Sequence, residues 1–182
     1  PETEWRALGL DPARFTLIYA GIMNPPQGLD VLLDATVKLR AAAPDLAARF
    51  QLAMIGAGSE RARLVARVEN EGLGDVVRFV AEQPRDAIPP LLRTAGAIAV
   101  TLRPRKDTHT VPSKLNEAMA SGRPVLVSAD GAPAEILREA QAGLATPASD
   151  ADALAASIRA LLEDPARAQA FGEAGRAYAA AF

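Results

Sequence analysis

Short apolar runs alternate with helical patterns along the whole chain, and this alternation restricts the fold more than any other feature. The segments between the runs carry apolar residues at the three- and four-residue spacing of a helix. Strands that lack a polar face are typical of a parallel sheet covered by helices on both faces. The sequence therefore predicts an α/β domain of three layers with about six parallel strands. The expected strands are residues 15–20, 50–55, 76–80, 97–102 and 124–128, and a short one near Leu144.

Proline, glycine and capping residues mark the expected helices. The helix that begins near Leu29 is expected to end before Pro44, and Ser59 is expected to cap the helix after the second strand. Residues 1–14 mix charged and apolar residues and include one tryptophan, and Asp11-Pro12 marks a turn before the first strand. Further helices are expected at 88–93, 113–121 and 133–140, from about 151, and from 165 to the end.

Composition excludes several classes of function. The formal net charge is −2, so the chain lacks the basic field that holds a nucleic-acid backbone. It contains no cysteine and one histidine, which excludes disulfides and thiolate chemistry and argues against a zinc site. No apolar run approaches the roughly 18 residues of a membrane-spanning helix. The 182 residues fit a single domain, 1–182, and because the chain starts with proline we expect it to be part of a longer protein.

The stretch 111–126 predicts a binding site at the start of a helix. Pro112 disfavours helix before it, Ser113 is a suitable N-cap, and Gly122 stops the helix. Lys114 and Glu117 are three residues apart and within reach of each other. Free backbone N–H groups at a helix start attract anions. A hydroxyl, an ammonium, amides and a carboxylate together suit a diphosphate attached to a sugar hydroxyl.

Sheet topology would place this stretch beside a crevice. If the strands follow the Rossmann-like order 3-2-1-4-5-6, the carboxyl ends of the first and fourth strands form the switch point at which ligands bind. The loops that leave these strands are 21–28 and 103–110, and 111–126 follows directly. Two simpler interpretations stay open here: Glu117 as a solvated partner of Lys114, and the glycines at 56 and 58 as a turn at the crevice rim.

Several motifs follow one another in a fixed order along nearly the whole chain. They are Tyr19-Ala20-Gly21, Gln27-Gly28-Leu29-Asp30, Ile55-Gly56-Ala57-Gly58, Ser113-Lys114-Leu115-x-Glu117-Ala118-x-Ala120-x-Gly122-x-Pro124-Val125-Leu126, Gly131-Ala132-Pro133-Ala134-Glu135-Ile136 and Leu161-x-Glu163-Asp164-Pro165. This set resembles the C-terminal domain of glycosyltransferase family 4 (group 1), especially the members that build bacterial surface polysaccharides.

The resemblance implies one half of a GT-B architecture, which pairs two Rossmann-like domains. The chain would be the donor-binding half of a retaining, hexosyltransferase-type enzyme, and it would be inactive without the N-terminal acceptor domain. The donor would be a UDP- or GDP-linked sugar, with no further cofactor and no metal, and the acceptor a glycan or a lipid-linked glycan. The implied location is cytoplasmic, with any docking at the inner membrane made by the absent half.

The family is marked by two glutamates separated by seven residues. The second glutamate, which binds ribose hydroxyls, falls on Glu117, and the first, which faces the donor sugar, falls on His109. This substitution replaces a fixed negative charge with an imidazole that can donate or accept a hydrogen bond. The resemblance therefore implies that His109 contacts the sugar, whereas the residue by itself is typical of a loop histidine with no role.

The first loop also departs from the family pattern. Where many members have arginine and lysine for the pyrophosphate, this chain has Ile22 or Met23 and Gln27. The cation is then expected from Lys114, Arg103 or Arg105, or from a segment absent from this chain, and Lys114 is preferred. The expected catalytic residues are His109, Lys114 and Glu117, and the expected donor contacts are Gly21, Gln27, Gly56, Ala81, Ser113, Lys114, Leu115 and Glu117.

Two other functions are considered. A non-catalytic nucleotide-sugar-binding or scaffold domain would explain the histidine at 109 and the cation-poor first loop. An NAD-linked oxidoreductase would use the glycines at 56 and 58, but Arg61 stands where a dinucleotide fingerprint needs its third glycine.

Overall fold

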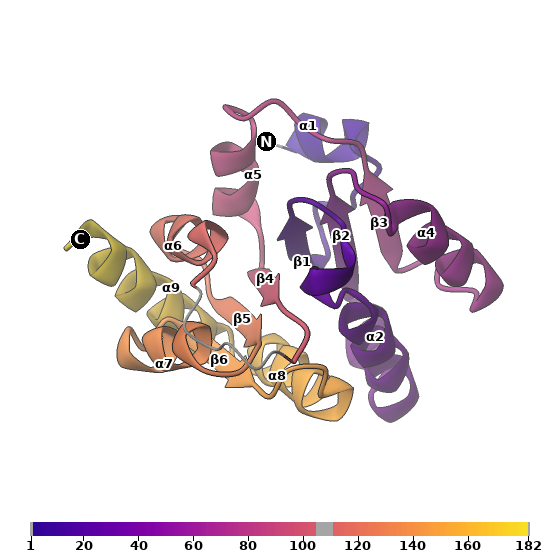
Figure 1. Ribbon diagram of the computed structural model, residues 1–182. Coiled ribbons are helices and arrows are strands. Elements are labelled where there is room, and N and C mark those ends of the chain that lie inside the picture. The colour runs from indigo at the N-terminus through magenta and orange to yellow at the C-terminus, as the bar shows by residue number, and fades with distance from the viewer. Residues whose placement is uncertain (1, 105–110, 182) are drawn as a thin grey trace.

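The computed structural model describes residues 2–104 and 111–181, and within them the chain forms an α/β domain around one parallel sheet (Figure 1). The strand order is β3-β2-β1-β4-β5-β6, and every neighbouring pair is parallel. The expected fold class and strand order are confirmed. The strands are β1 (Phe15–Ala20), β2 (Phe50–Ile55), β3 (Val77–Val80), β4 (Ala97–Thr101), β5 (Val125–Ser128) and β6 (Gly143–Thr146).

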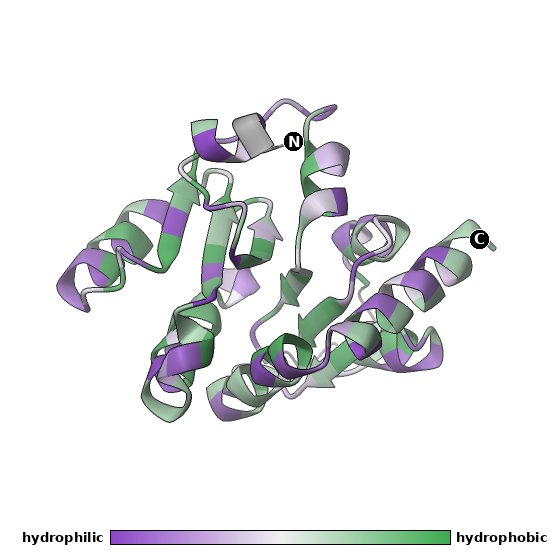
Figure 2. Cartoon of the chain, turned by 180° about the vertical axis from the view of Figure 1, so that it is seen from behind, coloured by the Kyte–Doolittle hydropathy of each residue, from purple (hydrophilic) through white to green (hydrophobic). Residues whose placement is uncertain are grey.

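Helices cover both faces of the sheet and complete the three layers. In β1, Leu17 belongs to the core under α2, α3, α4 and α8, whereas its neighbour Ile18 belongs to the core under α1, α5, α6 and α7. Figure 2 shows hydrophobic residues concentrated in the strands. The helices are α1 (Glu2–Ala7), α2 (Asp30–Ala42), α3 (Pro44–Ala47), α4 (Arg61–Asn70), α5 (Ile88–Thr94), α6 (Ser113–Ala120), α7 (Ala132–Glu139), α8 (Ala151–Glu163) and α9 (Pro165–Ala180), with a short 3-10 helix, η1 (Pro25–Gln27).

The switch point lies between β1 and β4. Strand β1 pairs with β2 on one side, where Ala20 is opposite Ile55, and with β4 on the other, where Leu17 is opposite Ala97. The chain leaves β1 and β2 through glycines 21 and 56, at the same edge of the sheet. Parallel strands bring their carboxyl ends together, so this edge collects the loops that can hold a ligand.

The amino-terminal segment contains a helix that the sequence patterns did not reveal. In α1, Trp5 is only 5% exposed, and its indole N–H donates to the Thr94 hydroxyl at 2.8 Å. Helix α3, which starts at Pro44, was also not predicted. Both helices are short, and periodicity is a weak signal over one or two turns. None of the described helices is long and apolar enough to cross a membrane.

Two expected capping residues do not cap. Helix α6 has Pro112 at its N-cap, with an extended backbone, so Ser113 is already the first helical residue. The Leu115 amide closes the first turn of α6 by donating to the Pro112 carbonyl at 2.9 Å. Helix α4 has Glu60 at its N-cap position, and the Ser59 hydroxyl instead donates to the Asn24 side chain at 3.4 Å. The expectation that Ser59 and Ser113 are N-caps is therefore wrong.

Candidate functional site

A cleft of about 560 Å³ opens at the carboxyl edge of the sheet. Its floor comes from the ends of β1 and β2 and its walls from the loop after β3, the start of α5 and one side chain of α6. Such a crevice at the switch point of a parallel sheet is the usual ligand site of this fold class. The cleft is lined by Ala20, Gly21, Ile22, Ile55, Gly56, Ala57, Gly58, Glu82, Gln83, Arg85, Ile88 and Glu117.

Glycines allow the two floor loops to touch. A Cβ at Gly56 would overlap the Gly21 carbonyl oxygen, and one at Gly58 would overlap the Met23 carbonyl. Backbone hydrogen bonds join the same segments: the Met23 amide donates to the Ala57 carbonyl at 2.7 Å, and the Glu60 amide donates back to the Met23 carbonyl at 2.9 Å. Gly56 and Gly58 thus form the tight turn at the rim, with positive φ of 136° and 150°.

Glu117 is the carboxylate of α6 that reaches the cleft. Its side chain is exposed, and it also lines a second cavity of about 390 Å³ between α5 and α6. Among the described residues no ion pair joins Glu117 to Lys114. The expected pairing of Glu117 with Lys114 is therefore not formed, whereas its expected exposure on the helix is confirmed, and the carboxylate can accept hydrogen bonds from a ligand.

Lys114 lies underneath the cleft, beside Gly21. Its ammonium donates to the Gln27 side-chain oxygen and to the Tyr19 hydroxyl at 3.3 Å, and it sits 4.7 Å from the centre of the Tyr19 ring. The Tyr19 hydroxyl donates in turn to the Ile22 carbonyl at 2.6 Å. These partners are all neutral, and burial lowers the pKa of Lys114 to about 8. A Cβ at Gly21 would lie 3.9 Å from the ammonium, so only a glycine backbone separates it from the cleft.

The other expected site residues are spread around this centre. Gly21, Gly56 and Glu117 line the cleft together. The side chain of Gln27 accepts a hydrogen bond from Lys114. Ala81 and Ser113 are exposed, and Ala81 is next to Glu82, which lines the cleft. Leu115 is fully buried and its amide is used by the Pro112 carbonyl, so the structure does not bring it to the cleft. His109 and Arg105 lie outside the described residues, and Arg103 packs against Gly28.

Two residues of this region were not singled out by sequence reasoning. Arg85, in the exposed loop between β3 and α5, lines both the cleft and the second cavity. Tyr19 belongs to a buried strand and to the first motif of the family resemblance, but no role was expected for its side chain, which supplies the ring and hydroxyl against which Lys114 is held. A polar loop after an apolar strand at the carboxyl edge was the available signal for Arg85, whereas no local pattern pairs Tyr19 with a residue so distant in the chain.

Comparison with known proteins gives the family. The model of the group 1 glycosyl transferases matches residues 2–178. A D-inositol 3-phosphate glycosyltransferase of Catenulispora acidiphila is 31% identical over 96% of this chain and 42% of its own length. A GDP-mannose-dependent phosphatidylinositol monomannoside mannosyltransferase of Mycolicibacterium smegmatis is 31% identical over 85% of this chain and 40% of its own. The chain thus spans less than half the length of these relatives.

Solved structures agree on the fold. The Anabaena protein HepE in complex with UDP-glucose superposes with a TM-score of 0.81 at 22% identity, covering 99% of this chain and 47% of that protein. Sucrose-phosphate synthase of Thermosynechococcus elongatus gives a TM-score of 0.82 at 27% identity over 100% of this chain and 44% of its own. The domain matches the Rossmann-like halves of GT-B glycosyltransferases, and the chain belongs to the group 1 glycosyl transferases.

Proposed function

We propose that the cleft binds a nucleotide-diphospho-sugar and that this chain is the donor-binding half of a retaining glycosyltransferase. One observation carries the proposal: the carboxylate of Glu117, which has no ion-pair partner within residues 2–104 and 111–181, faces the glycine-lined ends of β1 and β2 across the cleft at the switch point. The relatives named above include a GDP-mannose-dependent enzyme, and a structural neighbour was crystallised with UDP-glucose. Both support a nucleotide-sugar donor.

The chemistry assigned to each residue follows from its surroundings. Glu117 accepts hydrogen bonds from the two ribose hydroxyls. The diphosphate lies over the backbone of Gly21, where no side chain blocks it from the Lys114 ammonium. Backbone N–H groups at the start of α6 that have no helical partner would add hydrogen bonds to the same anion. As the bond from the sugar to the phosphate breaks, negative charge grows on the leaving diphosphate, and Lys114 stabilises that charge.

The acceptor would be a glycan or a lipid-linked glycan, bound by another part of the full-length protein. The relatives are more than twice as long as the segment they share with this chain. We expect the chain alone to bind donor without transferring its sugar. The contact between His109 and the donor sugar stays a prediction, because that residue lies outside the described residues.

Titration calorimetry with UDP, GDP, UDP-glucose, GDP-mannose and NAD⁺ tests the proposal. We expect saturable binding of one nucleotide family and none of NAD⁺. Because a hydrogen bond to a charged group contributes about 1.5–3 kcal/mol, Glu117→Gln should weaken binding by roughly one to two orders of magnitude. Glu69→Gln, at an exposed position of α4, is the matched control and should bind as the wild type does.

Each contrary outcome has a defined meaning. If Glu117→Gln binds UDP or GDP as tightly as the wild type, the ribose assignment is wrong. If no nucleotide binds saturably to the wild type, the proposal fails and the scaffold function stands in its place. Binding of NAD⁺ alone would support the oxidoreductase.

A further inference from the structure

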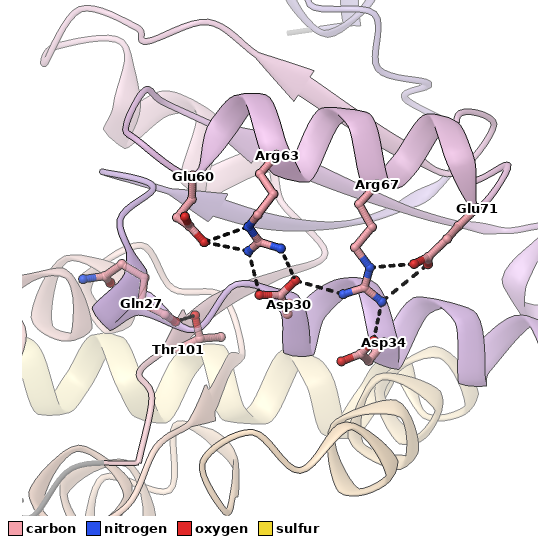
Figure 3. A network of polar contacts seen from close by, with 8 residues as sticks. All are labelled: Gln27, Asp30, Asp34, Glu60, Arg63, Arg67, Glu71 and Thr101. Carbon is pink, nitrogen blue, oxygen red and sulfur yellow. Dashed lines mark hydrogen bonds and ion pairs between the residues drawn. The ribbon is translucent and has the colours of Figure 1, made fainter.

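Two arginines of α4 connect four carboxylates, two on α2 and two that flank the ends of α4 (Figure 3). Arg63 donates to both oxygens of Asp30, at 3.0 and 2.7 Å, and to Glu60 at 2.6 Å. Arg67 reaches the same Asp30 at 3.0 Å and also binds Asp34 and Glu71. Asp30 is therefore the shared centre of the network.

The network sits directly behind the two loops that form the floor of the cleft. Asp30 is the first residue of α2, immediately after the loop 21–29, and Glu60 and Arg63 stand at the start of α4, immediately after the loop 56–59. The hydrogen bonds of Met23 with Ala57 and Glu60 join these loops in front. Backbone contacts at the cleft and ion pairs behind it thus hold the same pair of segments.

The first loop is fixed at a second point close by. The Thr101 hydroxyl of β4 donates to the Gln27 carbonyl at 2.7 Å, three residues before Asp30 (Figure 3). The Gln27 side chain is the partner of Lys114. A displacement of the first loop would therefore move both the Gly21 backbone and the group that orients the lysine.

The ion pair between Asp30 and Arg63 has the two-point geometry that fixes the relative orientation of its two partners. A guanidinium that binds both carboxylate oxygens fixes the relative angle of the two groups as well as their distance. The Asp30 side chain is 33% exposed, and hydrogen bonding from Arg63 holds its pKa below the ordinary value, so it stays ionised at neutral pH. An exposed ion pair alone contributes little to the free energy of unfolding. The main effect of the Asp30–Arg63 pair is therefore to fix the relative orientation of the two side chains.

We propose that Asp30 and Arg63 are positioning residues for donor binding. Their two-point ion pair locks the loop after β1 against the loop after β2 and so sets the spacing of Gly21 and Gly56 under the diphosphate. This inference rests on the proposed function only where it concerns the donor; the locking of the loops is a property of the free protein.

The test compares Arg63→Met, Arg63→Lys and a control, Lys38→Met. Lys38 forms an ion pair of 2.7 Å with Asp152, joining α2 to α8 away from the cleft. Amide hydrogen exchange at Met23 and Glu60 is measured by NMR in the free protein, and the Kd for UDP by calorimetry. The melting temperature is recorded for every variant, so that an effect on the loops is separated from a general loss of stability.

Arg63→Met should speed exchange at both amides and weaken UDP binding, each about fivefold, while Lys38→Met leaves both at wild-type values. Arg63→Lys, which keeps the charge but not the two-point geometry, should recover only part of each effect. Unchanged exchange in Arg63→Met would overturn the proposal, and so would accelerated exchange with an unchanged Kd. If the wild type binds no nucleotide but exchange still rises only in the Arg63 variants, the proposed function fails and the locking of the loops stands.

Discussion

The Lys114 ammonium is held 3.3 Å from the Tyr19 hydroxyl and over the Tyr19 ring, with no carboxylate among its described partners. A positive charge in such a site is attracted by the ring and by two neutral oxygens, but burial opposes it, and its pKa falls to about 8. An arriving diphosphate would supply the missing negative charge. A bound diphosphate would therefore stabilise the protonated lysine more than these neutral partners do.

Donor affinity should fall as pH rises through about 8. The diphosphate favours protonated Lys114, so binding by the free protein weakens once the ammonium loses its proton. Between pH 7 and pH 9 the protonated fraction drops about tenfold for a group with this pKa, and the Kd for UDP-glucose should rise by a similar factor. Lys114→Arg keeps its charge and should show a flat profile. A flat profile in the wild type would exclude Lys114 as the cation.

Stability should change with pH in the opposite direction. The pKa of Lys114 is about 8 in the folded protein and 10.5 as the ordinary value, so between these values the unfolded chain binds more protons and folding becomes more favourable as pH rises. Burial raises the pKa of Tyr19, and its ionisation in the unfolded chain reverses the trend above about pH 10. Urea unfolding at pH 7 and pH 9.5, followed by the fluorescence of the single tryptophan, measures the increase in the free energy of unfolding.

Removing the buried charge should stabilise the free protein at neutral pH. Lys114→Met keeps an unbranched apolar side chain, one atom shorter, and removes the unfavourable burial of the ammonium, so the free energy of unfolding at pH 7 should increase by on the order of 2 kcal/mol. The same variant should lose donor binding. A destabilised Lys114→Met would show that the contacts with Gln27 and Tyr19 outweigh the burial of the charge.

Most of the fold could be predicted because it depends on local signals. Strands β1 and β2 have the boundaries expected from their apolar runs, and the switch point follows from the strand order. The glycines that end these strands and Glu117, three residues after Lys114, could be placed at the cleft for the same reason. The strand boundaries and the glycines that follow them are set within a few residues, whereas the strand order was expected from the fold class.

The rest of the site depends on contacts between distant segments. Lys114 and Glu117 were expected to be neighbours from their spacing, but the lysine turns toward Tyr19 and Gln27, which arrive from β1 and its loop. The network centred on Asp30 joins α2 to α4 and has no signature in either helix alone. Such pairings are set by how the helices lie on the sheet, which helical periodicity does not specify.

Gly56→Ala should destabilise the protein and open the floor of the cleft. The new methyl group would overlap the Gly21 carbonyl oxygen at a residue with φ of 136°, so either the loops separate or the backbone is strained. We expect a loss of about 2–4 kcal/mol and weaker UDP binding. Gly74→Ala is the control, because a Cβ there has no atom within 4 Å. Equal effects of the two substitutions would contradict this account of the loop contact.

Gly172→Ala should loosen α9 from the end of α6. Alanine in a helix is normally more favourable than glycine by about 1 kcal/mol, but a Cβ at Gly172 would overlap the Gly122 carbonyl oxygen, where α9 crosses the turn after α6. The steric overlap should reverse the sign and lower the free energy of unfolding by about 1–3 kcal/mol. At Gly175 a Cβ would lie 2.9 Å from the Ala142 Cβ and 3.5 Å from the nearest backbone atom, a milder overlap than at Gly172, so Gly175→Ala should lower the free energy of unfolding by less. Urea unfolding of both variants gives the comparison; if Gly172→Ala is the more stable of the two, α9 has room to shift and does not fix α6.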